Sequence, residues 1–200
     1  MKKKSPKDEF DMECWYRSIV ADPYQVFAES FLHSEMYHFR SVIKKICHYA
    51  EAEELYKGQS PCDVLLYMKI IRSVIKAAYH LKEKKKGPIE VTEHDIFNKN
   101  YYCSHLKSST EWADFPRFLS MKEFCNPYRV LKKFFKYQSL EKWLHDWEEM
   151  VDCALSEFGG GMELDMIATY THLAKLIEGA HLINVREVNH IGGTLKNRFY

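Results

Sequence analysis

The chain has 200 residues, enough for one domain or for two small domains that share a core. Lysine and arginine (29) nearly balance aspartate and glutamate (28), and a net charge of +1 gives no support to a general nucleic-acid binder. Apolar residues make up 46% of the chain, with only 8 glycines and 6 prolines, which argues against disorder and against a fold of short strands and turns.

No segment of the sequence predicts secretion or a membrane span. The N-terminus is basic (Met-Lys-Lys-Lys), but no apolar stretch follows it, and no apolar run has the length of a transmembrane helix. The six cysteines include no Cys-x-x-Cys pair, and several lie in apolar helical stretches, where a thiol acts as a small hydrophobic side chain. We therefore expect a reduced, cytoplasmic protein that does not contact a membrane.

A pattern of residues occurs twice, at a separation of 104 positions that later becomes 102. Asp22-Pro23-Tyr24 returns as Asn126-Pro127-Tyr128, and Phe39 corresponds to Trp143. Further pairs at these separations are Ile43/Trp147, Ile46/Met150, Ala50/Ala154, Asp63/Asp165, Ile71/Leu173 and Ala78/Ala180. Such self-similarity predicts two copies of one structural unit, and positions at which the copies differ are candidates for specialised chemistry.

Each copy predicts a short helix followed by a long one. The Asp-Pro and Asn-Pro pairs are start signals, because the first side chain caps free N–H groups and proline has no N–H to leave unpaired. The expected short helices cover about 22–33 and 126–137, and the long helices cover about 35–56 and 140–157. A single kinked helix in place of each pair is the alternative.

A third helix follows in each copy. Ser60-Pro61 opens the first, which ends before Gly87-Pro88. The second carries apolar side chains at a period near 3.6, namely Met166, Tyr170, Leu173, Ile177 and Ala180. The glycines at 159–161 read as a turn between helices, and a small β-hairpin after each unit would fit the turns that follow Ile89–Val91 and Ile183–Val185.

The predicted fold is therefore all-α. Residues 1–9 form a charged tail, and residues 10–100 form a first helical unit that begins with a short helix over 10–20. Residues 101–120 form a linker whose aromatic side chains should pack against the protein, and residues 121–200 form the second unit. We expect the two helical-hairpin units to pack about a pseudo-twofold axis as one compact bundle, with Phe39 and Trp143 in the shared core.

Two groups of histidines are candidates for chemistry. Glu35 and His38 have the Glu-x-x-His spacing of di-iron bundles, with His33 nearby, but the second copy has Ser139 and Lys142 at the equivalent positions and cannot complete such a site. We therefore predict no metal or cofactor and retain His33, Glu35 and His38 only as weak candidates. His172 and His181 flank Glu178, and we expect a buried, hydrogen-bonded ring at His181.

Lysines cluster in two segments that lie far apart in the sequence. The candidate nucleic-acid-binding residues are Lys84, Lys85, Lys86, Lys132, Lys133 and Lys136. Clustered lysines can contact the phosphates of a nucleic acid. The alternative is that these lysines are the solvated faces of helices and bind no ligand. A separate asymmetry is that Lys44-Lys45 corresponds to Glu148-Glu149 at the offset of 104, so that the two predicted copies differ in charge at one position.

One stretch resembles a known family. Asp165 to Asn184 is similar, in its helical period and its Ile-Asn end, to a helical stretch in regulators of bacteroidete conjugative transposons. The resemblance covers about a tenth of the chain, and the basic part that follows this stretch in the family is absent here. No function is carried over from it.

The sequence contains no pattern that defines a catalytic reaction. We therefore expect a non-enzymatic, cytoplasmic helical binding or scaffold protein, with a protein as partner and a homo-oligomer as a further possibility. The first alternative is a nucleic-acid-binding regulator that uses the lysine patch. The second alternative is a metal-dependent enzyme with a site between the two units.

Overall fold

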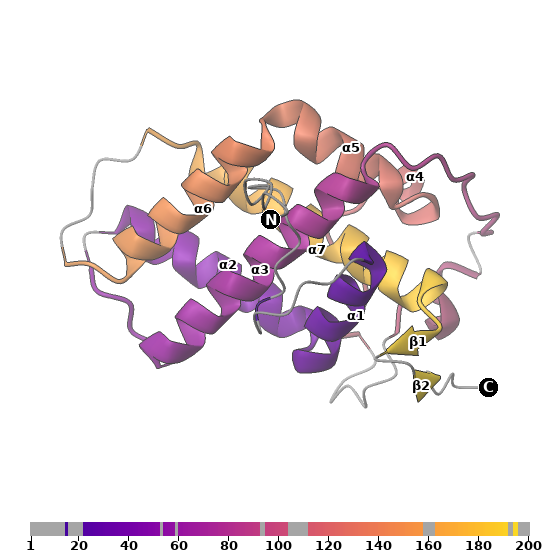
Figure 1. Cartoon of the computed structure of the whole chain (residues 1–200), viewed down its shortest axis with the longest axis horizontal. Helices are drawn as coiled ribbons and strands as arrows, with labels where there is room; N and C mark the ends of the chain where they lie inside the picture. Colours follow the sequence, from indigo (N-terminus) through magenta and orange to yellow (C-terminus); the bar gives the residue numbers. More distant parts are fainter. Residues whose placement is uncertain are drawn as a thin grey trace, which may run out of the picture.

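The structure is a computed structural model of the chain (Figure 1). It describes residues 15, 22–52, 54–58, 60–92, 95–103, 112–157, 163–191 and 194–195. The predicted tail over 1–9, most of the predicted helix over 10–20 and the glycines at 159–161 lie outside these residues.

The described part of the chain is mostly helical, which confirms the prediction of an all-α fold. Its helices are α1 (Pro23–His33), α2 (Met36–Glu51), α3 (Pro61–Leu81), α4 (Met121–Cys125), α5 (Tyr128–Tyr137), α6 (Leu140–Ala154) and α7 (Met166–Glu187). Two short 3-10 turns, η1 (Asp95–Phe97) and η2 (Lys99–Tyr101), precede α4. No helix among the described residues has both the length and the apolar character needed to cross a membrane.

The predicted start signals act as caps. The side chain of Asp22 accepts a hydrogen bond from the Tyr24 N–H at 3.0 Å, and the Ser60 hydroxyl does the same for Cys62 at 3.3 Å. Between α1 and α2, Ser34 has an extended backbone and ends the first helix. The alternative of one kinked helix is therefore wrong for this pair.

The long helices cross one another around a common core. α2 packs against α6 and α7, α3 packs against α6 and α1, and α5 packs against α7 (Figure 1). Phe39 and Trp143 are fully buried in the same apolar cluster, as predicted. Trp143 stacks on Phe134 with ring centres 4.0 Å apart, and its Nε1 donates to the Phe134 carbonyl oxygen at 3.1 Å.

A β-hairpin occurs only near the C-terminal end of the described part. β1 (His190–Ile191) pairs antiparallel with β2 (Thr194–Leu195). Ile183–Val185, where the sequence predicted this feature, belongs to α7, because residues there are buried and the helical period continues through them. No strand follows Ile89–Val91 among the described residues, so the predicted hairpin after the first unit is wrong. The backbone there instead lies against the end of α4, because the Ile89 N–H donates a hydrogen bond to the Cys125 carbonyl oxygen at 3.0 Å.

The linker packs against the protein in part. Tyr102 is buried beside Phe124 and Leu182 in a small second core, whereas Trp112 keeps 53% of its surface exposed. Arg186 on α7 holds this region, with Nε donating to the Tyr101 carbonyl oxygen at 2.9 Å. Helix α4 was not predicted, and its Ser120–Glu123 capping box explains where it begins.

Candidate functional site

The exposed face of α5 is cationic. Arg129, Lys132, Lys133 and Lys136 follow one another at spacings of three, one and three residues, and all four are exposed. In a helix this spacing places side chains on one face, while Leu131 and Phe134 turn into the core.

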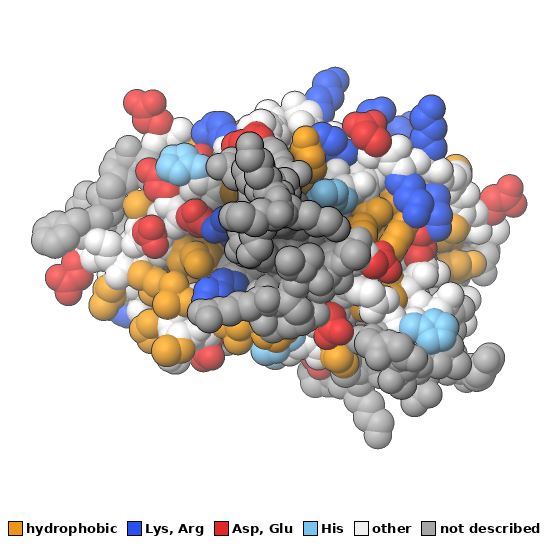
Figure 2. Space-filling view, in the orientation of Figure 1, with side chains coloured by type: hydrophobic (Ala, Val, Ile, Leu, Met, Phe, Trp, Pro, Cys, Tyr) orange, Lys and Arg blue, Asp and Glu red, His pale blue; other side chains and the backbone are white. Residues whose placement is uncertain are grey.

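The second lysine segment lies beside this helix. After α3 ends, residues 82–92 run past α4 and α5, and the Asn126 amide donates to the Lys86 carbonyl oxygen at 2.8 Å. The Lys82 ammonium lies 5.7 Å from the centre of the Phe135 ring on α5. The two lysine segments therefore run beside each other, and Figure 2 shows lysine and arginine side chains concentrated near α5. We call this set the cationic face: Lys84, Lys85, Lys86, Arg129, Lys132, Lys133 and Lys136.

Part of this charge is already paired. Lys133 bonds to the buried Glu123 carboxylate at 2.6 Å, Lys86 pairs with Glu187, and the Lys84 ammonium lies 4.5 Å from the centre of the Tyr24 ring. Within the described part of the chain, no ion pair is formed by the other four cations of the face, Lys85, Arg129, Lys132 and Lys136. These four carry the positive charge that a partner would meet.

An open pocket adjoins the cationic face. It measures about 690 Å³ and lies between residues 88–92 and the helices α4 and α5. Lys122 and Arg129 are among the residues that line it, together with Met121 and Cys125. The cationic face therefore borders a depression with both charged and apolar walls.

The weak metal candidates do not form a common site. His33 is exposed, and its ring centre lies 4.8 Å from that of Trp15, whereas the His38 ring lies 3.9 Å from that of Tyr37. Among the described residues, the group whose possible ligand atoms do lie within 4.8 Å of one another is His145, Asp146 and Glu149 on α6. Asp146 there accepts hydrogen bonds from Gln138 and Lys142, both at 3.0 Å, which uses its carboxylate for a structural purpose.

A buried ion pair lies between α2 and α7. Arg40 and Glu178 are 7% and 0% exposed, and the guanidinium donates to Glu178 Oε1 at 2.8 Å. Glu178 also accepts from the backbone N–H groups of Arg117 and Phe118, at 2.8 and 2.9 Å. Arg40 further donates to the carbonyl oxygens of residues 113 and 115. This pair therefore fixes the segment before α4 onto the two long helices.

His181 is buried, as the sequence predicted. Its Nε2 lies 2.9 Å from the Tyr102 carbonyl oxygen and 3.9 Å from the buried Asp114 carboxylate. His172 is half-buried and stacks on Tyr137 with ring centres 4.2 Å apart, and burial lowers the pKa of its imidazole. Both rings have packing roles, and neither lines a pocket described here.

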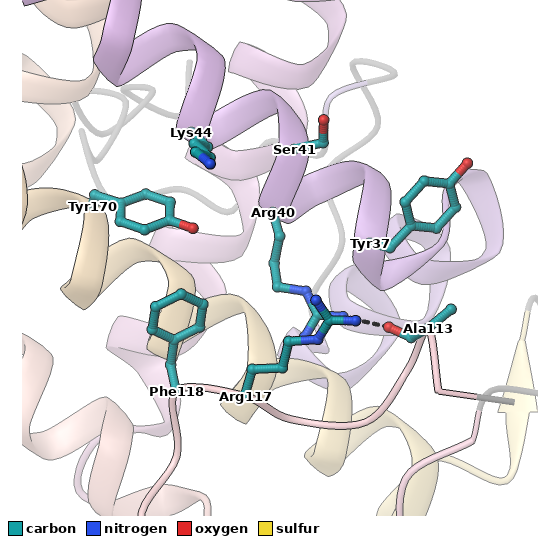
Figure 3. A pocket seen from close by; sticks show the side chains of 8 residues that line it. All are labelled: Tyr37, Arg40, Ser41, Lys44, Ala113, Arg117, Phe118 and Tyr170. Carbon is teal, nitrogen blue, oxygen red and sulfur yellow. Dashed lines mark hydrogen bonds between the residues drawn. The ribbon is translucent and has the colours of Figure 1, made fainter. Parts of the chain in front are cut away.

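A second pocket opens directly above the Arg40–Glu178 pair. We call it the α2–α7 pocket; it measures about 650 Å³ and is lined by Tyr37, Arg40, Ser41, Lys44, Ala113, Arg117, Phe118 and Tyr170. In Figure 3, Phe118 and Tyr170 lie on one side, Tyr37 lies on the other, and both arginines lie between them. The Phe118 and Tyr170 rings meet edge to face, with centres 5.5 Å apart.

The lining of this pocket is rich in cations and lacks acidic groups. No carboxylate, imidazole or thiol is among its eight residues. Glu178 lies beneath it, but Arg40 and two backbone N–H groups already satisfy that carboxylate. Burial, the largest influence, raises the pKa of Tyr170, so its hydroxyl stays neutral and can donate a hydrogen bond.

Sequence reasoning did not find the α2–α7 pocket, although one signal was visible. At the offset of 104, Lys44 corresponds to Glu148 and Arg40 to Leu144, so the pocket lies where the predicted copies differ. The Lys44 contrast was noted as a charge asymmetry. Its connection to Arg117 and Tyr170 was not visible, because those residues lie far away in the sequence.

Known proteins give no further guide to these sites. A scan against models of protein families found no match, and neither a search of curated proteins nor one of solved structures found a similar protein.

Proposed function

We propose that this protein is a non-enzymatic binding protein that presents the cationic face to an anionic macromolecule in the cytoplasm. The observation that carries the proposal is the gathering of Lys84–Lys86 and the α5 cations on one surface, from segments that are separated by more than forty residues. Four of these cations form no ion pair with the described residues. Cations of this kind attract an anionic partner and steer its approach.

We further propose that the scaffold is a duplicated unit, in which α1, α2 and α3 correspond to α5, α6 and α7. Two contacts support this view. Tyr24 and Tyr128, which correspond at the offset of 104, share a hydrogen bond between their hydroxyl groups. α2 also packs against its counterpart α6, as two elements beside a twofold axis would. The α5 part of the cationic face is specific to the second copy, because Gln25 and Glu29 occupy the positions of Arg129 and Lys133.

Among the described residues that line the α2–α7 pocket, the lack of a carboxylate, imidazole or thiol supports binding over catalysis. Carboxylate and imidazole groups are the commonest general acids and bases at neutral pH, and they act within hydrogen-bond distance of the substrate. Glu178 and His181 are buried and hydrogen-bonded to other parts of the protein, which suits them to structural roles.

We place an acidic protein surface first among the possible partners. The net charge of the chain is only +1, and Lys86 and Lys133 are already paired with carboxylates. Both facts limit how strongly the protein could attract an extended polyanion. Nucleic acid is the second candidate. The observation that favours it is the cation spacing along α5, which spans about 10 Å from residue 129 to residue 136 at 1.5 Å per residue. Nucleic-acid phosphates recur every 3.4 Å along the axis of each strand, so several could be contacted.

Fluorescence anisotropy would test the proposal with three labelled probes: a poly-glutamate peptide, a DNA duplex and a single-stranded RNA. We expect micromolar binding of at least one probe at low salt, weakening steeply as salt is raised. Lys132→Gln with Lys136→Gln should weaken it about tenfold, because two exposed charged contacts of about 0.7 kcal/mol each sum to about 1.4 kcal/mol. Lys45→Gln with Lys69→Gln is the matched control, since both lysines are exposed and lie outside the face.

The probes distinguish the two candidate partners. Peptide binding without nucleic-acid binding supports the protein partner, and the reverse supports nucleic acid. If none of the probes binds at low salt, or if both double variants weaken binding equally, the cationic face has no specific role and the proposal is wrong.

A further inference from the structure

We propose that the α2–α7 pocket binds a small organic anion that joins a phosphate group to a flat ring, the chemistry of a mononucleotide. This inference is independent of the cationic face. It rests on the charge, the aromatic walls and the size of the pocket.

The charge of the lining calls for an anion. Arg40 is 7% exposed and is neutralised by Glu178 at 2.8 Å, so the net charge of this pair is about zero. Lys44 and Arg117 then remain as exposed cations at the pocket, and the lining has no carboxylate to balance them. A phosphate bound by Arg117 would gain charge-assisted hydrogen bonds, because arginine can bond to two phosphate oxygens at once, and Lys44 adds a second positive charge to the pocket.

The buried pair also makes this a built site instead of a loose group of surface charges. Glu178 binds the N–H groups of Arg117 and Phe118, so it fixes the backbone from which both side chains project. Arg40 holds the same segment from α2 through the carbonyl oxygen of Phe115 at 3.0 Å. The positions of Arg117 and Phe118 relative to Lys44 are therefore set by buried contacts before any ligand arrives, which lowers the entropy cost of binding.

The walls favour a flat ring. Phe118 and Tyr170 form an edge-to-face pair on one side of the cations, and Tyr37, 39% exposed, lies on the other side (Figure 3). Stacking of a nucleobase on an aromatic side chain contributes about 1–3 kcal/mol. The neutral Tyr170 hydroxyl and Ser41 supply hydrogen bonds for polar groups on the ring.

The size is suitable for one such molecule. Pockets for small ligands measure about 300–1,000 Å³, and this one measures about 650 Å³. At the 104 offset, Tyr37, Ser41 and Lys44 correspond to Glu141, His145 and Glu148. The second copy therefore has carboxylates, Glu141 and Glu148, where the pocket has Tyr37 and Lys44. These carboxylates would repel an anion, so we expect the anion to bind to the first copy alone.

Isothermal titration calorimetry on the full chain would test the proposal, with AMP, adenosine and inorganic phosphate as separate probes. We expect AMP to bind with a Kd in the millimolar range or tighter, and adenosine and phosphate to bind at least tenfold more weakly. Lys44→Gln and Arg117→Gln should each weaken AMP binding about tenfold, the loss of one charge-assisted contact. Both residues are exposed, so the variants should fold, and an unchanged melting temperature would verify this.

Lys45→Gln is the matched control, because Lys45 is the exposed neighbour of Lys44 on α2 and does not line the pocket. It should leave AMP binding unchanged, as should the Lys132→Gln, Lys136→Gln double variant of the cationic face. Tyr37→Ala should weaken AMP binding several-fold and leave phosphate binding unaffected. Three results would overturn the proposal: no AMP binding at millimolar concentration, equal affinities for AMP and phosphate, or AMP binding that withstands both Lys44→Gln and Arg117→Gln.

Discussion

The hydroxyl oxygens of Tyr24 and Tyr128 lie 2.8 Å apart, although 104 residues separate them in the sequence. The Tyr128 hydroxyl also donates to the Glu187 carboxylate at 2.7 Å, so it links α5 to the end of α7 as well as to the start of α1. The same separation relates the two predicted copies. The proposed twofold arrangement would place a hydrogen bond between corresponding residues on its axis.

Replacing Tyr128 with phenylalanine tests this link. The variant keeps the ring but removes the hydroxyl that serves both Tyr24 and Glu187, and we expect a loss of about 1–2 kcal/mol in the free energy of unfolding. Urea denaturation measures it, and combination with Tyr24→Phe should cost less than the sum of the two changes, because the tyrosines share one bond. Tyr137→Phe, at an exposed ring, is the control. Strictly additive losses would show that the shared bond contributes nothing.

The Arg40–Glu178 pair should be the most sensitive polar contact in the protein. Glu178→Gln leaves the Arg40 guanidinium buried without a counter-charge, and we expect it to destabilise the fold by about 3–5 kcal/mol. Adding Arg40→Met to Glu178→Gln should recover part of this loss, because the uncompensated charge is removed. Glu54→Gln, which breaks an exposed pair with Lys57, should leave the unfolding midpoint unchanged. If Glu178→Gln and Glu54→Gln change the free energy of unfolding equally, burial does not strengthen the interaction between Arg40 and Glu178.

The two tryptophans Trp143 and Trp112 should respond differently to truncation. Trp143 is fully buried and hydrogen-bonded to the Phe134 carbonyl, so Trp143→Ala should cost about 3–5 kcal/mol. Trp112 is 53% exposed, so Trp112→Ala should cost much less. Thermal unfolding followed by circular dichroism measures both. A Trp143→Ala variant with the native melting temperature would refute the placement of this ring in the core.

Glu123 should make the protein sensitive to acid. Burial raises the pKa of its carboxyl, but hydrogen bonds from Lys133 and Ser120 outweigh this, and the pKa falls from 4.5 to about 2. Because the folded pKa lies below the unfolded one, the stabilisation is complete above pH 4.5 and is lost as the pH falls towards 2. We therefore expect stability to decline across this window in acid titrations.

Glu123→Gln separates this carboxyl from the others. The amide can still cap α4, but it loses its charge-assisted bond to Lys133, so we expect a loss on the order of 2 kcal/mol at neutral pH. The decline between pH 4.5 and 2 should then be shallower than in the unmodified protein. Glu51→Gln, at an exposed carboxyl, is the control. An unchanged acid profile in Glu123→Gln would contradict the assignment.

The local features of this fold could be read from the sequence. Asp22 and Ser60 cap helices where the pattern placed them, because a cap needs only the next few residues. Phe39 and Trp143 are buried, because a period of 3.6 identifies the inner face of a helix before its neighbours are known. α7 continues through Ile183–Val185, beyond the last residue of the apolar pattern at Ala180, because these residues are buried.

Tertiary structure alone decided which distant residues meet. Lys86 lies beside Asn126, and Arg40 bonds to Glu178, because packed helices bring together segments whose local patterns contain no information about each other. The α2–α7 pocket depends on the same packing, since Lys44, Arg117 and Tyr170 belong to three separate segments. The sequence by itself thus determined the helices and their inner faces, which follow from local caps and periodicity. The charged surfaces and the pocket required the packed chain, because they depend on contacts between residues far apart in the sequence.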